Sequence, residues 1–240
     1  MDGPYAGSIA LVTDCLIIAV DGPAGSGKSS AARGVARSLG LRYLDTGAMY
    51  RALTWWMLDH EVQVGSAEAV AAQSGRPVIE VSTDPGSPVI SVDGTDVTAQ
   101  IRIRQVSNAV SAVASVPDVR TRLVAMQQEI IAGTCAAGAG IVAEGRDIGT
   151  VVAPGAPVKV YLTASESIRA ARRSADLAAD PSVTVALTQA EQQRRDHADA
   201  AQMAKARDAV LIDSTALNLD EVVSVIVGLA RERADAAWSR

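Results

Sequence analysis

The sequence predicts an α/β fold with a parallel central sheet, and three observations carry this prediction. Several short apolar runs are rich in Val and Ile and do not alternate with polar residues. Continuous apolarity of this kind is typical of strands that are covered on both faces. Stretches with helical spacing lie between these runs, and such alternation favours a parallel sheet flanked by helices. With 48% apolar and 20% charged residues among 240, the composition indicates a globular chain rather than a disordered one.

Five apolar runs are candidate strands, of which the second is the shortest and weakest. They are Leu16–Val20, Arg42–Leu44, Ile141–Ala143, Val158–Leu162 and Val210–Ile212. Two stretches have apolar residues at helical spacing. Ser29–Leu39 is followed by Gly40, a natural C-terminal stop, and Asp220–Arg233 has arginines in its last turn. These elements make up the predicted α/β core.

Two regions depart from this alternation. The two β-like runs Val78–Ser82 and Val89–Val92 are separated by Asp84-Pro85-Gly86, and Asp93-Gly94 follows the second run. Both of these short segments favour turns, so we expect a small antiparallel insertion, with a plain loop as the alternative. The second region, Ser165–Asp208, is polar, rich in Ala and dense in charge. We expect surface helices there, joined by a mobile segment.

Charge, cysteine content and hydropathy limit the possible partners. The net charge of −5 argues against a protein that coats nucleic acid, which needs a basic field. The most apolar segment, Ile9–Val20, is interrupted by Thr13 and Asp14, so no segment reaches the ~18 residues of a membrane span. Cys15 and Cys135 lack metal-ligand spacing and are expected to be reduced thiols. The first residues lack a basic region, so we expect no signal peptide and a cytoplasmic location. The acidic balance and modest size are compatible with a monomer, which is the expected state.

A phosphate-binding loop follows the first candidate strand, where residues 22–29 read GPAGSGKS and match G-x-x-x-x-G-K-[ST]. Glycines let backbone N–H groups approach a phosphate chain, and the N-terminus of the next helix carries partial positive charge. Lys28 is expected to reach the β and γ phosphates, and Ser29 to ligate Mg²⁺. The residues predicted to bind ATP here are Gly22, Pro23, Ala24, Gly25, Ser26, Gly27, Lys28, Ser29 and Ser30.

Arginines near strand or turn ends narrow the reaction class. They are Arg51, Arg120, Arg146, Arg194 and Arg195. A planar guanidinium group binds phosphate oxygens in pairs, although each such arginine alone is more often a solvated surface charge. Several arginines that converge on a phosphate-binding loop indicate a phosphoryl acceptor that is itself a phosphate. The chain has no N-K-x-D segment, so a GTPase is disfavoured.

Longer motifs give the chain a more specific resemblance. From about Leu16 to Val227 it resembles the bacterial cytidylate kinases, the (d)CMP kinases of the nucleoside-monophosphate kinase group of P-loop kinases. The strings LDTGAMYR at 44–51 and EGRDIGTVV at 144–152 are far more specific than the phosphate-binding loop. Shorter matches are Ile101-Arg102, Val106–Ser111, Pro117–Arg120, Arg194–Asp196 and Asp213–Thr215.

This resemblance implies both an architecture and a reaction. The implied fold is a P-loop kinase with a five-stranded parallel sheet, a small antiparallel β insertion and a helical lid. It implies one domain over residues 1–240, with a monophosphate-binding insertion at 65–115 and a lid segment at 165–205. The implied reaction is ATP-dependent phosphorylation of CMP and dCMP to CDP and dCDP in pyrimidine nucleotide metabolism, with Mg²⁺ accompanying ATP. Neither a nucleic-acid polymer nor a membrane is expected as a partner.

The resemblance also implies roles for individual residues. The CMP contacts fall on Thr46, Arg51, Ser111, Arg120, Arg146, Asp147, Arg195 and Asp199. Of these, Arg51 and Arg120 would hold the acceptor phosphate, and Ser111 and Asp199 would address base and sugar. The implied catalytic residues are Lys28, Arg146 and Asp147, the lid residues on ATP are Arg169 and Arg173, and the Mg²⁺ ligands are Ser29 and Glu144.

From the residues alone, structural alternatives stay open at several of these positions. Asp45 and Thr46 suit the cap of a helix that begins near Ala48. A solvated hydroxyl is the default interpretation of Ser111, and Asp147 is alternatively a structural partner of Arg146.

The arginines at 169, 172 and 173 share one helix face. They form either a solvated basic face or a set of lid arginines that reach the transferred phosphoryl group.

One segment departs from the resembled family, and it keeps other functions open. After Asp199 that family usually has an arginine three residues on and then Ser-Pro-Leu, whereas this chain has Ala200–Met203 and a shorter path onward. A substrate-phosphate contact is therefore missing unless another arginine, such as Arg207, replaces it. The alternatives are a P-loop kinase for a hydroxylated metabolite and a nucleotide-binding module without turnover.

Overall fold

A computed structural model describes residues 15–176 and 184–238. The beginning of the apolar stretch Ile9–Val20, the first residues examined for a signal peptide, and part of the predicted lid at 165–205 lie outside the described residues. In the described part of the chain, none of the helices combines the length and apolarity that crossing a membrane requires.

Five parallel strands form the central sheet, in the order β2-β6-β1-β7-β8. Their bounds are β1 Ile17–Asp21, β2 Arg42–Asp45, β6 Ile141–Gly145, β7 Val158–Thr163 and β8 Val210–Asp213. All five predicted runs are strands, including the weak second one. The register pairs Asp45 of β2 and Val20 of β1 with Glu144 of β6, so polar residues gather where these strands end.

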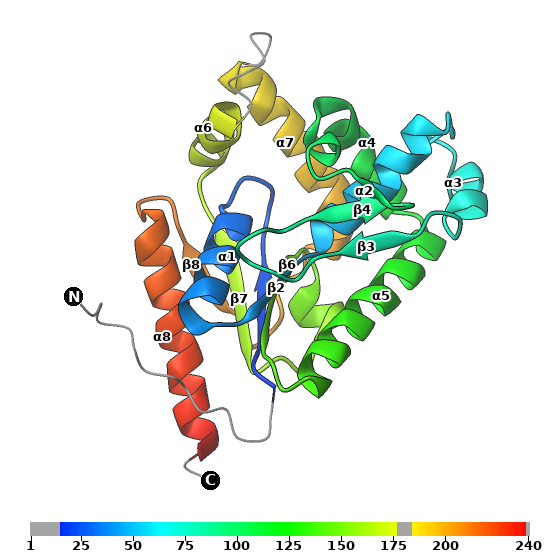
Figure 1. The fold of residues 1–240 in the computed structure, drawn as a ribbon. Coiled ribbons are helices and arrows are strands. Elements are labelled where there is room, and N and C mark those ends of the chain that lie inside the picture. Colours follow the sequence, from blue (N-terminus) through cyan, green and yellow to red (C-terminus); the bar gives the residue numbers. More distant parts are fainter. Residues whose placement is uncertain (1–14, 177–183, 239–240) are drawn as a thin grey trace.

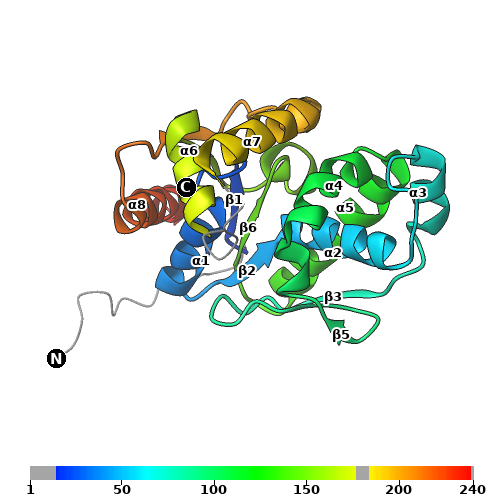
Figure 2. The same ribbon diagram turned by 90° about the horizontal axis from the view of Figure 1, so that it is seen from above.

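Helices cover both faces of this sheet (Figures 1 and 2). The helices α1 (Lys28–Leu39) and α8 (Leu219–Trp238) lie on one face, and α2 (Thr46–Asp59) and α5 (Pro117–Ala136) lie on the other. Side chains alternate between the two faces along a strand, so β1 contributes buried side chains to the helix layers on both faces. Ile18 is buried with α1 and α8, whereas Ala19 is buried with α2 and α5. Both predicted helices are confirmed within α1 and α8.

The insertion between α2 and α5 is a second, three-stranded antiparallel sheet with helices around it. Its elements are α3 Ala67–Gln73, β3 Ile79–Val81, β4 Ile90–Val92, β5 Thr95–Asp96, η1 Gln100–Arg102 and α4 Arg104–Ala114. The predicted antiparallel unit is confirmed, and the Asp93-Gly94 turn leads into a third strand, β5. The Tyr43 amide of edge strand β2 donates to the Thr83 carbonyl at 2.9 Å, so the insertion also contacts the central sheet.

Two helices lie above the end of the sheet from which the phosphate-binding loop emerges (Figure 1). These are α6 (Glu166–Asp176) and α7 (Val185–Asp199), and the short turn η3 (Ala200–Gln202) follows them. The view from above shows α7 extending from α6 toward α4 of the insertion (Figure 2). The prediction of helices in this segment is confirmed.

The prediction of two reduced thiols is wrong, because Cys15 and Cys135 form a disulfide with a Cα–Cα distance of 5.1 Å. Cys135 lies in the last turn of α5, which leads into β6, and β6 pairs in parallel with β1. Cys15, two residues before β1, therefore lies beside the end of α5. The two cysteines are 120 residues apart in sequence, so no local pattern indicates this contact.

Candidate active site

The phosphate-binding loop joins β1 to α1, and its backbone has a positive φ at three glycines, Gly22, Gly25 and Gly27. Gly22 has a φ of +149°, and a Cβ there would lie 2.0 Å from the Leu162 carbonyl oxygen. Gly27 caps α1 with a φ of +90°, in the left-handed region that favours glycine. In the described structure no side chain caps this helix, and no acidic residue lies in its first turn. Its first amide groups are therefore available to an anion.

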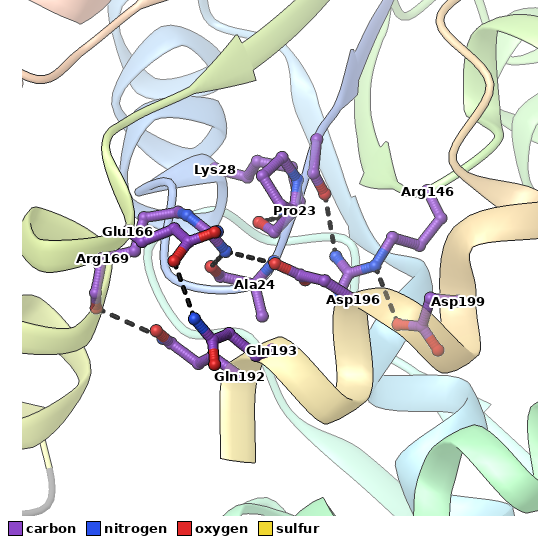
Figure 3. A network of polar contacts seen from close by, with 11 residues as sticks. Pro23, Ala24, Lys28, Arg146, Glu166, Arg169, Gln192, Gln193, Asp196 and Asp199 are labelled. Atoms are coloured by element: carbon purple, nitrogen blue, oxygen red, sulfur yellow. Dashed lines mark hydrogen bonds and ion pairs between the residues drawn. The ribbon is translucent and has the colours of Figure 1, made fainter. Parts of the chain in front are cut away.

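Lys28 begins α1 and turns back over the loop (Figure 3). Its buried Nζ donates to the Pro23 carbonyl at 2.8 Å. Burial, and then repulsion from the Arg146 guanidinium, lowers the pKa of Lys28 to about 7. The cation is therefore costly to hold in this site until an anion arrives.

Glu144 is the penultimate residue of β6, and its side chain is buried. Its Oε1 accepts from Ser29 Oγ at 2.5 Å and from Tyr43 Oη at 3.1 Å. Burial, and then repulsion from Asp45, raises the pKa of Glu144 to about 7, against the lowering effect of Lys28 and both hydrogen bonds.

The Ser29 and Glu144 oxygens fit a Mg²⁺ site of the type that phosphate substrates complete. Among the described residues, no group of three or more His, Cys, Asp or Glu could hold a metal ion. A Mg²⁺ ion that takes most ligands from phosphates and water needs only one or two protein oxygens. The adjacent hydroxyl and carboxylate supply that donor set.

A cavity of about 1240 Å³ opens above the phosphate-binding loop. It brings together residues from the loop, the insertion, the turn after β6 and the helices α6 and α7. The predicted site residues that line it are Ala24, Gly25, Ser26, Gly27, Lys28, Ser29, Ser30, Thr46, Arg51, Ser111, Arg120, Glu144, Arg146, Asp147, Arg173, Arg195 and Asp199. Pocket volumes of several hundred Å³ suit one small ligand, so this cavity is large enough for two.

Three predicted residues lie in the described structure without lining the cavity, namely Gly22, Pro23 and Arg169. Arg169 is 7% exposed, and its Nη1 contacts Asp196 Oδ2 at 2.5 Å and the Ala24 carbonyl at 2.9 Å. Asp196 also accepts from the Ala24 amide at 3.3 Å, so this ion pair joins α6 and α7 to the phosphate-binding loop (Figure 3). Arg172, on the same helix face, lines the cavity, and its Nη1 donates to Ser214 Oγ at 3.0 Å. The alternative of a solvated basic face is wrong for Arg169.

Two carboxylates pair with arginines inside the cavity. Arg146 Nε contacts Asp199 Oδ2 at 3.1 Å, and its Nη1 donates to the Gly22 carbonyl at 2.9 Å (Figure 3). Asp147 pairs with Arg120 of α5. The alternative in which Asp147 pairs with its neighbour Arg146 is therefore wrong, because the two side chains turn to partners on different helices.

Burial and repulsion from neighbouring cations lower the pKa values of two cavity arginines, Arg51 and Arg195. Burial, and then the guanidinium groups of Arg195 and Arg173, lowers the pKa of Arg51 to about 9. Burial, and then repulsion from Arg146, lowers the pKa of Arg195 to about 10. Repulsion of this strength between buried cations indicates a site prepared for anions.

Several smaller predictions concern hydroxyl and cap positions. Asp45 is the N-cap of α2 and accepts from the Ala48 amide at 2.8 Å, so the capping interpretation is confirmed. Thr46 lines the cavity while its hydroxyl donates to the Glu144 carbonyl at 2.7 Å. Ser111 Oγ is buried and, among the described residues, has no hydrogen-bond partner, so the default of a solvated hydroxyl is wrong.

Sequence reasoning gave no role to two residues that shape the site. Asp21, at the end of β1, accepts from the Ile148 and Gly149 amides at 2.8 Å each, and so anchors the turn η2 (Ile148–Val152) that follows Arg146. Its place at the end of an apolar strand is the only pattern that could have indicated this role. Ser107 of α4 accepts hydrogen bonds from two arginines, and nothing local in its sequence indicates that.

The segment after Asp199 places an amide rather than an arginine in the cavity. Gln202 of η3 is half-buried and lines the cavity. Within the described chain, Arg207 is exposed and does not line it. Arg207 therefore does not replace the missing arginine in this conformation.

The sequence of this chain is similar to proteins of one family. The family model described as cytidylate kinase matches residues 18–232. A cytidylate kinase of Streptomyces griseus is 48% identical over 92% of this chain and 95% of that protein. A cytidylate kinase of Streptomyces coelicolor is 49% identical over 91% of this chain and 94% of that protein. Among solved structures, a gluconokinase from Sinorhizobium meliloti 1021 has 17% identity and a TM-score of 0.49, over 94% of this chain and 96% of that one. With a family model spanning most of the chain and relatives near half identity, this chain belongs to the cytidylate kinase family of phosphotransferases.

Proposed function

We propose that this chain transfers the γ-phosphoryl group of ATP to CMP and dCMP, forming ADP together with CDP or dCDP. The observation that carries the proposal is the convergence of cations from separate elements on one cavity. Arg51 comes from α2, Arg146 follows β6, Arg173 and Arg195 come from the two lid helices, and all four face the cavity of Lys28. A donor phosphate chain alone would not require cations on the acceptor side, whereas a phosphate acceptor does.

In the proposed reaction an oxygen of the acceptor phosphate attacks the γ-phosphorus in line. A new P–O bond forms as the bond to the β-phosphate oxygen breaks, and ADP leaves. The attacking oxygen is already anionic, so no general base is needed. The protein contributes positioning and charge neutralisation, through Lys28 and the cavity arginines. Lid closure would exclude water, which would otherwise hydrolyse ATP.

We assign Mg²⁺ to Ser29 and Glu144, whose oxygens would hold the ion, and the ion would supply neutralisation of the charge that develops on the phosphates. Within the cavity we assign Arg51, Arg120, Arg146 and Arg195, with Thr46, Ser111, Asp147 and Asp199, to the acceptor nucleotide. The loop residues and Arg173 are assigned to ATP. In this structure the guanidinium group of Arg169 pairs with Asp196. We therefore assign Arg169 to ATP only for a different position of the lid.

The broader proposal is one kinase domain with a monophosphate-binding insertion at 65–115 and a lid at 165–205. We also propose a monomer that acts in the cytoplasm in pyrimidine nucleotide metabolism. The Cys15–Cys135 disulfide runs counter to the cytoplasmic location, because disulfides are rare in reducing compartments. Cell fractionation and the mass of the protein in solution test these two points.

The test of the activity is ADP release from Mg²⁺·ATP with CMP, dCMP, UMP, AMP and GMP as separate acceptors, beside a control without acceptor. We expect turnover that prefers CMP and dCMP. Lys28→Ala should reduce turnover by orders of magnitude and leave the fold unchanged. The exposed Arg42, outside the cavity, provides a matched control, and Arg42→Ala should keep full activity.

Two results would contradict the proposal. Near-normal turnover by Lys28→Ala would remove the assignment of the phosphate-binding loop. Binding of nucleotides without turnover of any monophosphate would show that the change after Asp199 has disabled the acceptor site and that the chain is a binding module.

A further inference from the structure

We propose that Ser107 is a positioning residue that holds one arginine of the acceptor side and one arginine of the lid on a shared hydroxyl. Ser107 lies in α4 of the insertion and is 7% exposed. Its Oγ accepts from Arg51 Nη1 at 2.9 Å and from Arg173 Nη2 at 3.3 Å. These two donors come from α2 and α6, which are far apart in the sequence. The inference rests on the proposed assignment of Arg51 to CMP and of Arg173 to ATP.

The shared hydroxyl counters an electrostatic cost. The guanidinium groups of Arg51 and Arg173 repel each other, and this repulsion contributes to the lowered pKa of Arg51. A neutral oxygen between two cations accepts from both, which offsets their mutual repulsion at short range. A carboxylate at this position would neutralise the charge that the substrate phosphates need. A hydroxyl orients the two arginines without adding negative charge to the site.

A second contact joins the same helices and supports this role for α4. Arg104, one turn before Ser107, contacts Glu191 of α7, with Arg104 Nη2 at 2.6 Å and Nε at 2.8 Å from Glu191 Oε1. Arg51 also donates to the Ile101 carbonyl at 3.1 Å, just before α4. The insertion therefore contacts the lid at one point through an ion pair and at the other through Ser107. A CMP phosphate that binds Arg51 would therefore also affect the Ser107 hydroxyl that orients Arg173.

The primary test compares Ser107→Ala with Ser107→Thr, which keeps the hydroxyl. Calorimetry measures the Kd of CMP and the Kd of a non-hydrolysable ATP analogue for each variant. We expect Ser107→Ala to weaken both by about tenfold, as for loss of a charge-assisted hydrogen bond, and Ser107→Thr to stay near wild type. Asn108 is exposed on the same helix and outside the cavity, so Asn108→Ala is the matched control with unchanged Kd values.

Double variants test whether Ser107 acts through the two arginines. In an Arg51→Ala background, Ser107→Ala should weaken CMP binding no further. In an Arg173→Ala background, it should weaken binding of the ATP analogue no further. Purely structural damage would instead add to the effect of each arginine variant. Thermal unfolding of Ser107→Ala, compared with Ser107→Thr, shows that the protein measured is folded.

The outcomes separate this inference from the function on which it rests. If Arg51→Ala leaves CMP binding unchanged, or Arg173→Ala leaves ATP-analogue binding unchanged, the site assignment fails and this inference falls with it. If both arginine variants weaken their nucleotides, the proposed site stands and Ser107 is tested alone. Additive effects, weakening of only one nucleotide, or equal weakening by Ser107→Thr would then overturn the positioning role.

Discussion

Binding of Mg²⁺·ATP should take up protons above pH 7 and release them below pH 7. The cause lies in two buried groups beside the phosphate-binding loop. Burial and Arg146 lower the pKa of Lys28 to about 7, and burial and Asp45 raise the pKa of Glu144 to about 7. A bound triphosphate favours the charged form of Lys28, and bound Mg²⁺ favours the charged form of Glu144. Both groups should therefore be charged in the complex.

The magnitude follows from the free-state pKa values. At pH 8 a group with a pKa of about 7 is about nine-tenths deprotonated, so Lys28 would gain roughly 0.9 of a proton while Glu144 loses roughly 0.1. At pH 6 the two contributions exchange, and the net value is a release of roughly 0.8. Binding raises the pKa of Lys28, so affinity falls as pH rises above about 7. Binding lowers the pKa of Glu144, so affinity falls as pH drops below about 7.

Titration calorimetry in buffers of different ionisation enthalpy measures this proton stoichiometry at pH 6, 7 and 8. Lys28→Met should lose the uptake at pH 8 and keep the release at pH 6. Glu144→Gln should show the opposite pattern. A wild-type stoichiometry near zero at both pH 6 and pH 8 would refute the reasoning, and so would variants that behave like the wild type.

Three further predictions test the loop, the disulfide and the lid. Gly22→Ala places a Cβ against the Leu162 carbonyl, so ATP should bind at least about tenfold more weakly while CMP binding persists; equal losses for both nucleotides in calorimetry would contradict this. Cys135→Ser should lower the free energy of unfolding by about 2–4 kcal/mol in denaturant titrations. Dithiothreitol should bring the wild type to the same value, and a wild type insensitive to it would contradict the disulfide. Gln202→Arg adds a cation to the cavity and should lower the Kd of CMP by about tenfold; an unchanged Kd would mean that the site already compensates.

The fold was largely predictable because its strands are continuous apolar runs and its phosphate-binding loop is a local motif. Even the weak run at Arg42–Leu44 forms β2, since a central partner, β6, covers its inner edge. The Cys15–Cys135 disulfide could not be predicted, because it depends on which strands become neighbours. The same holds for the third strand of the insertion, which at Thr95–Asp96 is too short to give a period.

The sequence predicted most of the residues that line the cavity, but it did not predict which of them form ion pairs with one another. Loop and motif residues gather in the cavity because they stand at strand ends, which meet at one edge of a parallel sheet. The choice of partner depends on how the lid lies over that edge. This is why Asp147 pairs with Arg120 rather than with its neighbour, and why Arg169 lies buried against Asp196. The spacing of these residues in the sequence indicates neither of these two ion pairs.

Charge pairing distinguishes Arg120 and Arg146 from Arg51 among the arginines that line the cavity. Arg120 and Arg146 each contact a carboxylate, so much of their charge is already balanced before any substrate binds. Arg51 and Arg173 both contact the neutral hydroxyl of Ser107. A phosphate gains most where positive charge is unbalanced, because a balanced pair must first give up its own partner. The acceptor phosphate is therefore expected beside Arg51, whose guanidinium group donates to a carbonyl and a hydroxyl. Arg120 and Arg146, which are also assigned to the acceptor nucleotide, must first give up Asp147 and Asp199 before they can bind that phosphate.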